Sequence, residues 1–499
     1  MKILHKINDE LILLAVKTEK VSKGDYFLIE DEELKKRMIV QVYDEEYLSN
    51  QSIMEDIVKD EIVSATSSGV SHDPLEIGVL SSMFRDSRLF KAKIRASAVD
   101  SNGGDISSDV TWLPSRVHSK IRRLAISELD IMIKRDGESA IPIGSADKTT
   151  EPFSIYAEDL DGKLNIITGR KESGKSHLSK LLVKSLVELG AFVLVFDLNN
   201  EYTGLGTKVD GSVSSFDSKI VLLEPGKNLC FSLRYCGKSS ISSMLKNALD
   251  MPSTSLREFF RIWDNLNRRQ AMTLDAFSNA INGWNINDLV RDALISRFHT
   301  IYNSGLLIRD ENDNEHLGLR FEKLISDNPH GLAMIVNMGR SPPTIRRMVV
   351  ELVLNKLVEL LGYDVIPPIF LFAEEAHLYI KETYWDDIIT RMRHFGIYST
   401  FITNHPEALG EGILRQVDNI FLFHFSNESD LDRISKISLV DKDTIKSIVR
   451  TLPQRHSLFI GKVVRELPIV VKVSPLDTIP YGETKKFFRR KSATLLSSK

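Results

Sequence analysis

The sequence predicts an α/β protein with an all-β segment at its amino-terminal end, and three observations support this prediction. About the first hundred residues hold short apolar or alternating runs separated by turn residues. From about residue 150, strand-like and helix-like segments alternate, which is typical of a parallel α/β sheet. Residues 169–176 fit the pattern G-x-x-x-x-G-K-[ST], a phosphate-binding loop between a strand and a helix.

The amino-terminal segment is expected to consist of short β-strands. Glycine-containing turns separate its strand-like runs, which are residues 11–16, 26–30, 38–43 and 89–94. We therefore expect residues 1–112 to form a small barrel or sandwich. Residues 113–149 carry proline, serine and charged residues, and we expect them to form a connector.

Residues 150–478 are expected to form the α/β domain. Its expected strands are residues 164–168, 192–196, 333–337, 369–373, 399–403 and 420–425. Between about residues 237 and 325 the strand signal lapses, which predicts an α-helical insertion. The expected helices in the insertion are residues 240–249, 256–266 and 286–304.

Charge limits how the chain can bind its partners. The net charge is −3 and the isoelectric point is about 6.5, so nucleic-acid binding would require a local basic surface. One candidate is the basic tail, residues 479–499, in which basic and aromatic residues gather at 485–491. Such a tail either binds nucleic acid or a partner, or is simply solvated.

The composition indicates a cytoplasmic protein. Cys230 and Cys236 match no zinc-binding spacing, and a reducing compartment is the simplest interpretation of so few cysteines. Residues 1–20 mix charges among apolar residues and make a poor signal peptide. Because no run of about 18 uncharged apolar residues occurs, no integral membrane segment is expected.

The phosphate-binding loop predicts a set of nucleotide contacts. Its glycines let successive N–H groups point at phosphate oxygens, and the helix that follows adds its positive end. Lys175 would contact the β- and γ-phosphates, and the Ser176 hydroxyl would ligate Mg²⁺. The expected nucleotide-binding residues are Gly169, Arg170, Lys171, Glu172, Ser173, Gly174, Lys175, Ser176 and His177.

Two carboxylates follow the expected strand 369–373, at the sheet edge where α/β proteins bind ligands. Glu374 would act on Mg²⁺, partly through water, and Glu375 would polarise the attacking water. The alternative for these residues is an ordinary solvated strand end.

Polar residues near other strand ends are further candidates. Asn404 follows the expected strand 399–403 and would sense the γ-phosphate, unless it only forms an Asn-x-Pro turn. Arg391 and Arg393 precede that strand, and either one would stabilise transition-state charge or form a surface ion pair.

Asp197 and Glu201 follow the expected strand 192–196. They would contact Mg²⁺-bound water or position a neighbouring subunit; the alternative is an Asp/Asn turn with an exposed glutamate. Residues 355–358 read Asn-Lys-Leu-Val and lack the acid of a guanine-reading N-K-x-D box. The expected cofactors are therefore ATP, rather than GTP, and Mg²⁺.

In this order the motifs resemble those of the HerA family of hexameric DNA translocases, within the wider HerA/FtsK group of P-loop ATPases. Besides the phosphate loop, the matching segments are 23–26 (a glycine-turn strand), 196–202 (F-D-x-x-x-E-Y), 374–377 (D/E-E-A-H), 393–396 (R-K-F-G), 403–406 (T-Q-R-P) and 467–468 (L-P). The chain departs from the family pattern at Glu172, where a small residue is usual, and at Asn404, which replaces a glutamine.

The resemblance implies an N-terminal β-barrel and a RecA-like core with a helical insertion. It also implies a homo-hexameric ring that moves double-stranded DNA, and a role in DNA end processing with a nuclease of the NurA type. In such a ring each ATP lies between subunits and an arginine of the neighbour completes the site. Lys175, Glu375, Arg393 and Asn404 would be the catalytic residues.

Two other functions stay open at this point. An ATP-gated scaffold or regulator without translocation would fit the bulky residues 170–172 and the slightly acidic isoelectric point. An ATPase of a conjugation or secretion machine would need a partner to supply a membrane anchor.

Overall fold

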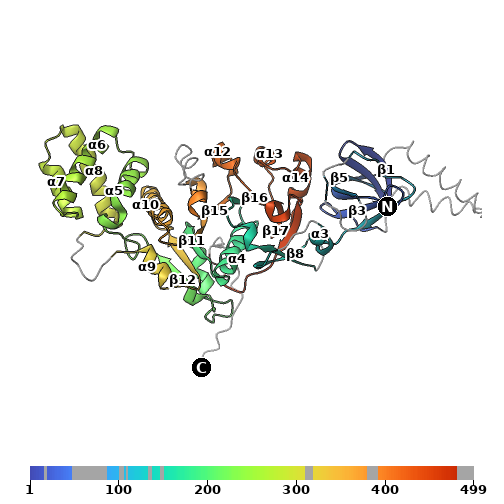
Figure 1. Ribbon diagram of the computed structural model, residues 1–499, viewed down its shortest axis with the longest axis horizontal. Helices are drawn as coiled ribbons and strands as arrows, with labels where there is room; N and C mark the ends of the chain where they lie inside the picture. Colours follow the sequence, from blue (N-terminus) through green and yellow to red (C-terminus); the bar gives the residue numbers. More distant parts are fainter. Residues whose placement is uncertain are drawn as a thin grey trace, which may run out of the picture. The chain divides into compact units, whose positions relative to one another are not determined.

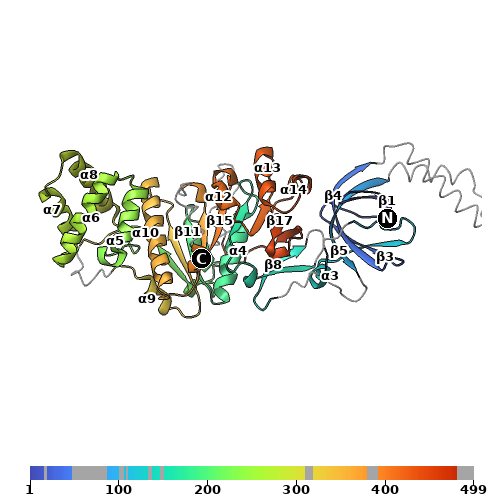
Figure 2. The same ribbon diagram turned by 45° about the horizontal axis from the view of Figure 1, so that its top comes forward.

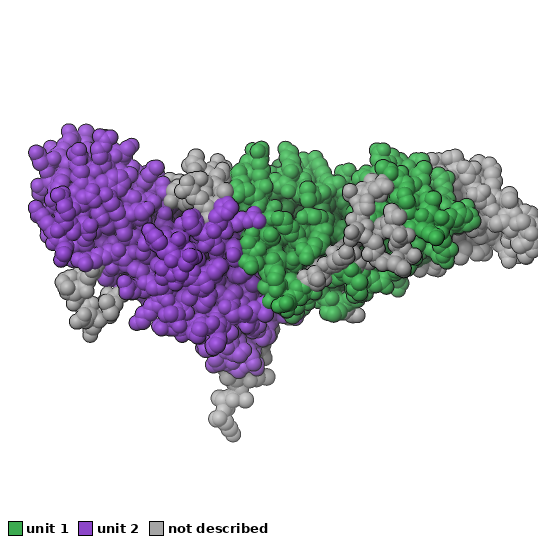
Figure 3. All heavy atoms as spheres, in the orientation of Figure 1, with its two compact units in different colours: residues 1–178, 403–474 green, residues 179–402, 475–499 purple. Residues whose placement is uncertain are grey.

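The computed structural model describes residues 1–15, 19–47, 87–99, 106–107, 111–132, 137–146, 151–309, 318–378, 392–479 and 481. The chain divides into two compact units (Figure 3). Unit 1 comprises residues 1–178 and 403–474, and unit 2 comprises residues 179–402 and 475–499. One division falls inside helix α4 (Lys175–Glu188) and another at the end of strand β15 (Ile397–Thr403).

Unit 1 begins with an antiparallel sheet (Figure 1). Its strand order is β1 (Lys2–Ile7), β2 (Glu10–Ala15), β5 (Arg88–Val99), β4 (Lys36–Tyr47), β3 (Tyr26–Asp31) and β7 (Ser119–Arg123), with β6 (Ile106–Ser107) paired to β5. Alternate residues such as Leu11, Leu13, Phe27 and Ile29 are buried in one core, as the period of a strand requires. The predicted strands of this segment coincide with β2, β3, β4 and β5.

The rest of unit 1 is a mixed sheet with helices. Its strand order is β10 (Asn165–Thr168), β16 (Asn419–Phe423), β17 (His456–Gly461), β18 (Ile469–Val473), β8 (Ala140–Ala146) and β9 (Pro152–Tyr156). β10 and β16 are parallel, and the later pairs are antiparallel. The sequence patterns did not reveal β8, β9, β17 or β18, which extend the sheet beyond its parallel strands.

The segment interpreted as a connector contributes to both sheets of unit 1. Within residues 113–149, β7 pairs with β3, helix α3 (Ile126–Met132) follows, and β8 pairs with β18. Proline and charge had suggested a connector. β7 is an edge strand, which accepts charged residues, and Pro142 of β8 lies at a register shift against β9 and outside the residues that pair with β18, where a strand accepts proline.

Arg95 joins the two sheets of unit 1 through helix α14 (Lys442–Val449), which follows helix α13 (Glu428–Ile437). The Arg95 guanidinium donates to the Asp441 carboxylate at 3.0 Å and to the Thr444 hydroxyl at 2.9 Å. Asp441 also accepts from the Thr444 backbone N–H and so caps α14. The amino-terminal sheet is therefore bonded to the first turn of α14.

Unit 2 contains the parallel strands β12 (Ile220–Leu223), β13 (Leu332–Asn337), β11 (Phe192–Asp197), β14 (Ile369–Glu374) and β15, in that order. Most of these strands are continuously apolar and buried, as expected of parallel strands covered on both faces. Helices α9 (Phe321–Ser326) and α10 (Pro343–Gly362) flank β13 in the chain. The α/β class predicted for this region is confirmed.

Between β12 and β13 the chain is mainly helical (Figures 1 and 2). The helices are α5 (Leu233–Ser243), a π segment (Met244–Ala248), α6 (Ser253–Arg268), α7 (Leu274–Gly283) and α8 (Asp288–Ser304). Phe259, Phe277 and Phe298 of α6, α7 and α8 stack in their shared core. The sequence had missed α7, a short helix capped by Thr273. Among the described residues, no helix is long and apolar enough to cross a membrane.

Candidate active site

The phosphate-binding loop of unit 1 connects β10 to α4, and its shape requires two glycines. Gly169 has a φ of 155° and Gly174 a φ of 121°, values that side chains with a Cβ rarely adopt. A Cβ on Gly169 would lie 2.5 Å from the Cβ of Phe423, and one on Gly174 would lie 3.0 Å from a ring atom of Phe423. Strand β16, which carries Phe423, therefore sets the curvature of the loop.

Lys175 is the first residue of α4, and its ammonium group is buried against the loop. Its side chain donates to the backbone carbonyls of Gly169 and Arg170, both at 2.9 Å, and to the Asn404 side-chain oxygen. Only 7% of Lys175 is exposed. The structure thus brings together two of the predicted catalytic residues, Lys175 and Asn404, within unit 1.

The outer face of the loop rests on residues 454–455, which sequence reasoning had missed. The Ser173 carbonyl accepts from the Arg455 N–H at 2.9 Å, and the Glu172 carbonyl accepts from the Gln454 amide at 3.1 Å. Glu172 and Arg455 both adopt left-handed backbone, with φ of 61° and 62°. Because Gln454 and Arg455 are exposed polar residues after a proline, no sequence pattern distinguished them from an ordinary turn.

The remaining predicted loop residues lie at the start of α4 or on the surface. Arg170 and Lys171 are exposed, and the Arg170 N–H donates to the His424 carbonyl at 3.0 Å. His177 donates from Nε2 to the Ser474 carbonyl at 2.6 Å. Ser176 lies in the first turn of α4, as the expected role on Mg²⁺ requires.

Unit 2 holds the carboxylates. Glu374 ends β14 and is only 2% exposed. The Tyr202 hydroxyl, itself wholly buried, donates to Glu374 Oε1 at 2.7 Å and lies 2.7 Å from the Ser179 hydroxyl. Burial raises the pKa of Glu374, and the negative charges of Glu201, Asp197 and Glu375 raise it further. Ser179 and Tyr202 were not predicted, because their bonds depend on packing between segments far apart in the sequence.

Asp197 forms the turn after β11. Its carboxylate accepts from the backbone N–H groups of Asn199, Glu201 and Tyr202 at 3.0 to 3.2 Å. The Asp/Asn-turn interpretation is therefore correct for Asp197. Its companion expectation of an exposed Glu201 is wrong, since only 12% of that side chain is exposed and Lys180 lies 3.7 Å from its carboxylate.

The other predicted residues of unit 2 follow β14 or precede β15 in the sequence. Glu375 has a φ of 46°, and its Oε2 lies 3.5 Å from Nδ1 of His377. Arg393 is half-buried in a helical turn just before β15. Arg391 lies outside the described residues.

The polar residues of each unit carry the oxygen ligands that Mg²⁺ prefers. Mg²⁺ is usually held by one or two carboxylates, substrate phosphates and water rather than by an all-protein cage. In unit 1 the Ser176 hydroxyl at the start of α4, and in unit 2 the buried Glu374 carboxylate at the end of β14, are each a ligand of that chemical kind. The described residues contain no group of three or more His, Cys, Asp or Glu arranged to hold a metal ion.

Sequence comparison identifies proteins to which this chain is similar. Residues 141–357 match the model of the HerA helicase central domain. The DNA double-strand break repair helicase HerA of Saccharolobus solfataricus is 23% identical over 419 residues, 78% of each chain. Its namesake in Sulfolobus acidocaldarius is 22% identical over 331 residues, covering 61% of this chain and 63% of the relative.

Solved structures with a similar fold support the α/β fold class described above. VirB4 of Thermoanaerobacter pseudethanolicus superposes with a TM-score of 0.52 at 13% identity, over 70% of this chain and 99% of that one. The bacterial conjugative coupling protein TrwB gives a TM-score of 0.50 at 12% identity, over 72% and 94%. At such low identity the likeness is one of fold alone.

Proposed function

We propose that the chain is an ATPase that moves double-stranded DNA through a ring of its own copies; its match to the HerA helicase central domain and its similarity to two HerA helicases support this proposal. The observation that carries this proposal is the phosphate-binding loop with the buried Lys175 held between loop carbonyls and Asn404. The two relatives are named as DNA double-strand break repair helicases, which supports a role in DNA end processing. A nuclease partner of the NurA type is the part that rests on family resemblance alone.

Nucleotide binding follows from the chemistry of the loop. Its backbone N–H groups and the start of α4 would hold the β- and γ-phosphates of ATP, and the Lys175 ammonium would neutralise them. Mg²⁺, when bound, would supply positive charge against the phosphates. Ser176 and Glu374 would hold it, with Glu374 acting partly through water.

Hydrolysis requires groups that act on the attacking water and on the charge that develops on the phosphate. We assign the first role to Glu375, directly after the buried Glu374. Asn404 would contact the γ-phosphate. Because its side chain is hydrogen-bonded to Lys175, that contact would also affect the position of the Lys175 ammonium group. Arg393 would supply positive charge to a transferring phosphate, in its own subunit or in a neighbour's.

The remaining parts of the chain would serve the ring. The amino-terminal antiparallel sheet corresponds in this proposal to the barrel of the family, and helices α5 to α8 correspond to its insertion. DNA would be held by its phosphates, a contact that is independent of sequence and sensitive to salt.

The test is the steady-state ATPase rate with and without linear duplex DNA, with the Lys175→Ala variant as the blank. A severalfold stimulation by duplex DNA, lost as salt rises, is the expected result. A rate equal to that of the blank would refute the ATPase itself. A rate above the blank but indifferent to DNA would instead favour an ATP-gated scaffold.

A further inference from the structure

We propose that Tyr202 is a positioning residue for metal binding: its hydroxyl holds the Glu374 carboxylate at a fixed orientation relative to helix α4. This inference rests on the proposed function, since it assigns Glu374 to Mg²⁺. The hydroxyl lies 2.7 Å from Glu374 Oε1 and 2.7 Å from the Ser179 hydroxyl. Tyr202 therefore makes both short contacts of a three-residue hydrogen-bonded chain, in which the Ser179 hydroxyl also donates to Glu374 Oε1 over a longer distance of 3.5 Å.

The donors in this chain have one consistent order when Glu374 is ionised. A carboxylate only accepts, so the single hydroxyl proton of Tyr202 points at Glu374. The Tyr202 oxygen then accepts from Ser179 at 2.7 Å, a shorter contact than the 3.5 Å one from the Ser179 hydroxyl to Glu374 Oε1. This order fixes the rotation of the carboxylate about its last bond, which a lone glutamate at a strand end would leave free.

Tyr202 itself is held at several points. Its backbone N–H donates to Asp197 Oδ2 at 3.0 Å, and its ring is completely buried. The Lys180 ammonium lies 5.9 Å from the ring centroid. A side chain locked in this way can position a neighbour, because its own alternative rotamers are excluded.

Ser179 connects this chain to the phosphate-binding helix. It lies three residues after Ser176 in α4, so the two share one helix face. Glu374 is a proposed Mg²⁺ ligand, and within unit 2 the path Ser179–Tyr202–Glu374 connects its strand to the part of α4 that begins at Ser179. Groups that orient metal ligands in this way typically change metal affinity by about 10- to 100-fold when they are removed.

The experiment is an equilibrium binding assay. A fluorescent ATP analogue is bound to the full chain in EDTA-treated buffer, and Mg²⁺ is titrated in. Tyr202→Phe keeps the ring and removes the hydroxyl, and we expect the Mg²⁺ concentration at half-saturation to rise by about tenfold or more. Binding of the analogue without Mg²⁺ should change less than twofold.

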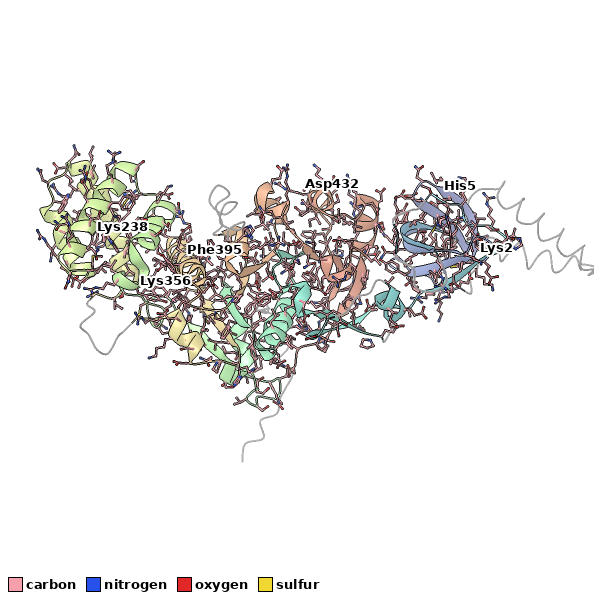
Figure 4. The ribbon with its side chains drawn as sticks, viewed as in Figure 1. Lys2, His5, Lys238, Lys356, Phe395 and Asp432 are labelled. Atoms are coloured by element: carbon pink, nitrogen blue, oxygen red, sulfur yellow. The ribbon has the colours of Figure 1, made fainter. Side chains whose placement is uncertain are left out.

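Tyr235→Phe is the matched control. Tyr235 is also a tyrosine of unit 2 whose hydroxyl donates to a carboxylate, Glu322, at 2.7 Å. Tyr235 lies on α5. The ammonium group of Lys356 of α10, labelled in Figure 4, lies 4.3 Å from the centroid of the Tyr235 ring. The control should lose thermal stability without shifting the Mg²⁺ titration.

Equal Mg²⁺ shifts in the two tyrosine variants, or no shift in Tyr202→Phe, would overturn the positioning role and leave Tyr202 as a structural residue. If Tyr202→Phe does not fold, Ser179→Ala decides: a smaller shift in the same direction supports the chain, and an unchanged titration refutes it. Failure of the proposed function looks different, because the wild-type chain would then bind the analogue no better than Lys175→Ala.

Discussion

The two groups of candidate residues, the loop half in unit 1 and the acidic half in unit 2, are built by different means. In unit 1, backbone geometry shapes the phosphate-binding loop: two glycines in conformations closed to other residues, and loop carbonyls bonded to Arg455 and Lys175. In unit 2, side chains position the carboxylate, through Tyr202 and Ser179. The loop should therefore be most sensitive to added Cβ atoms, and the acidic half to the loss of single polar groups.

The largest effect is expected from Glu375→Gln in the acidic half. Without a carboxylate to polarise water, ATP turnover should fall by at least about 1,000-fold, while ATP binding stays within a few-fold of wild type. Single-turnover hydrolysis and analogue binding measured on the same preparation separate the two steps. Normal turnover in this variant would remove Glu375 from the catalytic assignment.

Gly174→Ala should break the loop half. The added Cβ would lie 3.0 Å from the Phe423 ring and 3.2 Å from the Cα of Arg455, at a φ of 121°. We expect ATP-analogue affinity to fall by about 100-fold, measured by fluorescence titration.

Gly190→Ala is the control for that variant. Gly190 also has a positive φ, of 93°, but nothing lies within 4 Å of an added Cβ. It should cost only about 1 kcal/mol of stability, with unchanged nucleotide affinity. If both variants bind the analogue normally, the loop does not depend on its backbone shape.

Glu374→Gln should reveal how much folding free energy the buried Glu374 carboxylate costs when it is ionised. The pKa of Glu374 is raised above its unfolded value, so the folded state binds the proton more tightly than the unfolded chain does. The protonated carboxyl therefore contributes folding stability at low pH, and this contribution is lost as pH rises through the folded pKa. In EDTA, the variant should therefore be more stable than wild type at pH 8, by at least about 1 kcal/mol, and nearly equal at pH 4. Urea unfolding at both pH values measures this difference, and a pH-independent difference would contradict it.

The smallest effect concerns Glu172. A left-handed residue with a Cβ costs about 1 kcal/mol, so Glu172→Gly should stabilise the fold by about 0.5 to 1 kcal/mol. Lys171→Gly, at a neighbouring position without a positive φ, should instead destabilise it by about as much. Thermal unfolding of both variants tests whether a glycine in the loop changes stability by relieving backbone strain or by adding flexibility to the unfolded chain.

Sequence reasoning predicted the features that are encoded locally. The loop glycines, the apolar strands β10, β11 and β14, and the polar residues at their ends all follow from short patterns. The resemblance to the HerA family followed from the order of those motifs, and residues 141–357 match the model of the HerA helicase central domain. The separate roles of Glu375, Arg393 and Asn404 stay predictions.

The residues that sequence reasoning missed act across long separations. Tyr202 meets a glutamate 172 positions away, and Gln454 meets a loop residue 282 positions away. A buried tyrosine and an exposed glutamine look ordinary in a sequence, because packing alone decides which partner each one meets. The antiparallel strands β17 and β18 were missed for a related reason, since the expected pattern was one of parallel strands joined by helices.

Helix α14 has a practical consequence for fragment design. Its first turn is bonded to Arg95 of the amino-terminal sheet, and the chain that leaves its last turn reaches Gln454 and Arg455 beneath the phosphate-binding loop. Deleting residues 1–112 would therefore remove Arg95, which is hydrogen-bonded to the start of α14, and the segment that follows α14 hydrogen-bonds the phosphate-binding loop. An inactive truncated protein would say little about what the amino-terminal sheet does, whereas point substitutions at Arg95 in the intact chain would.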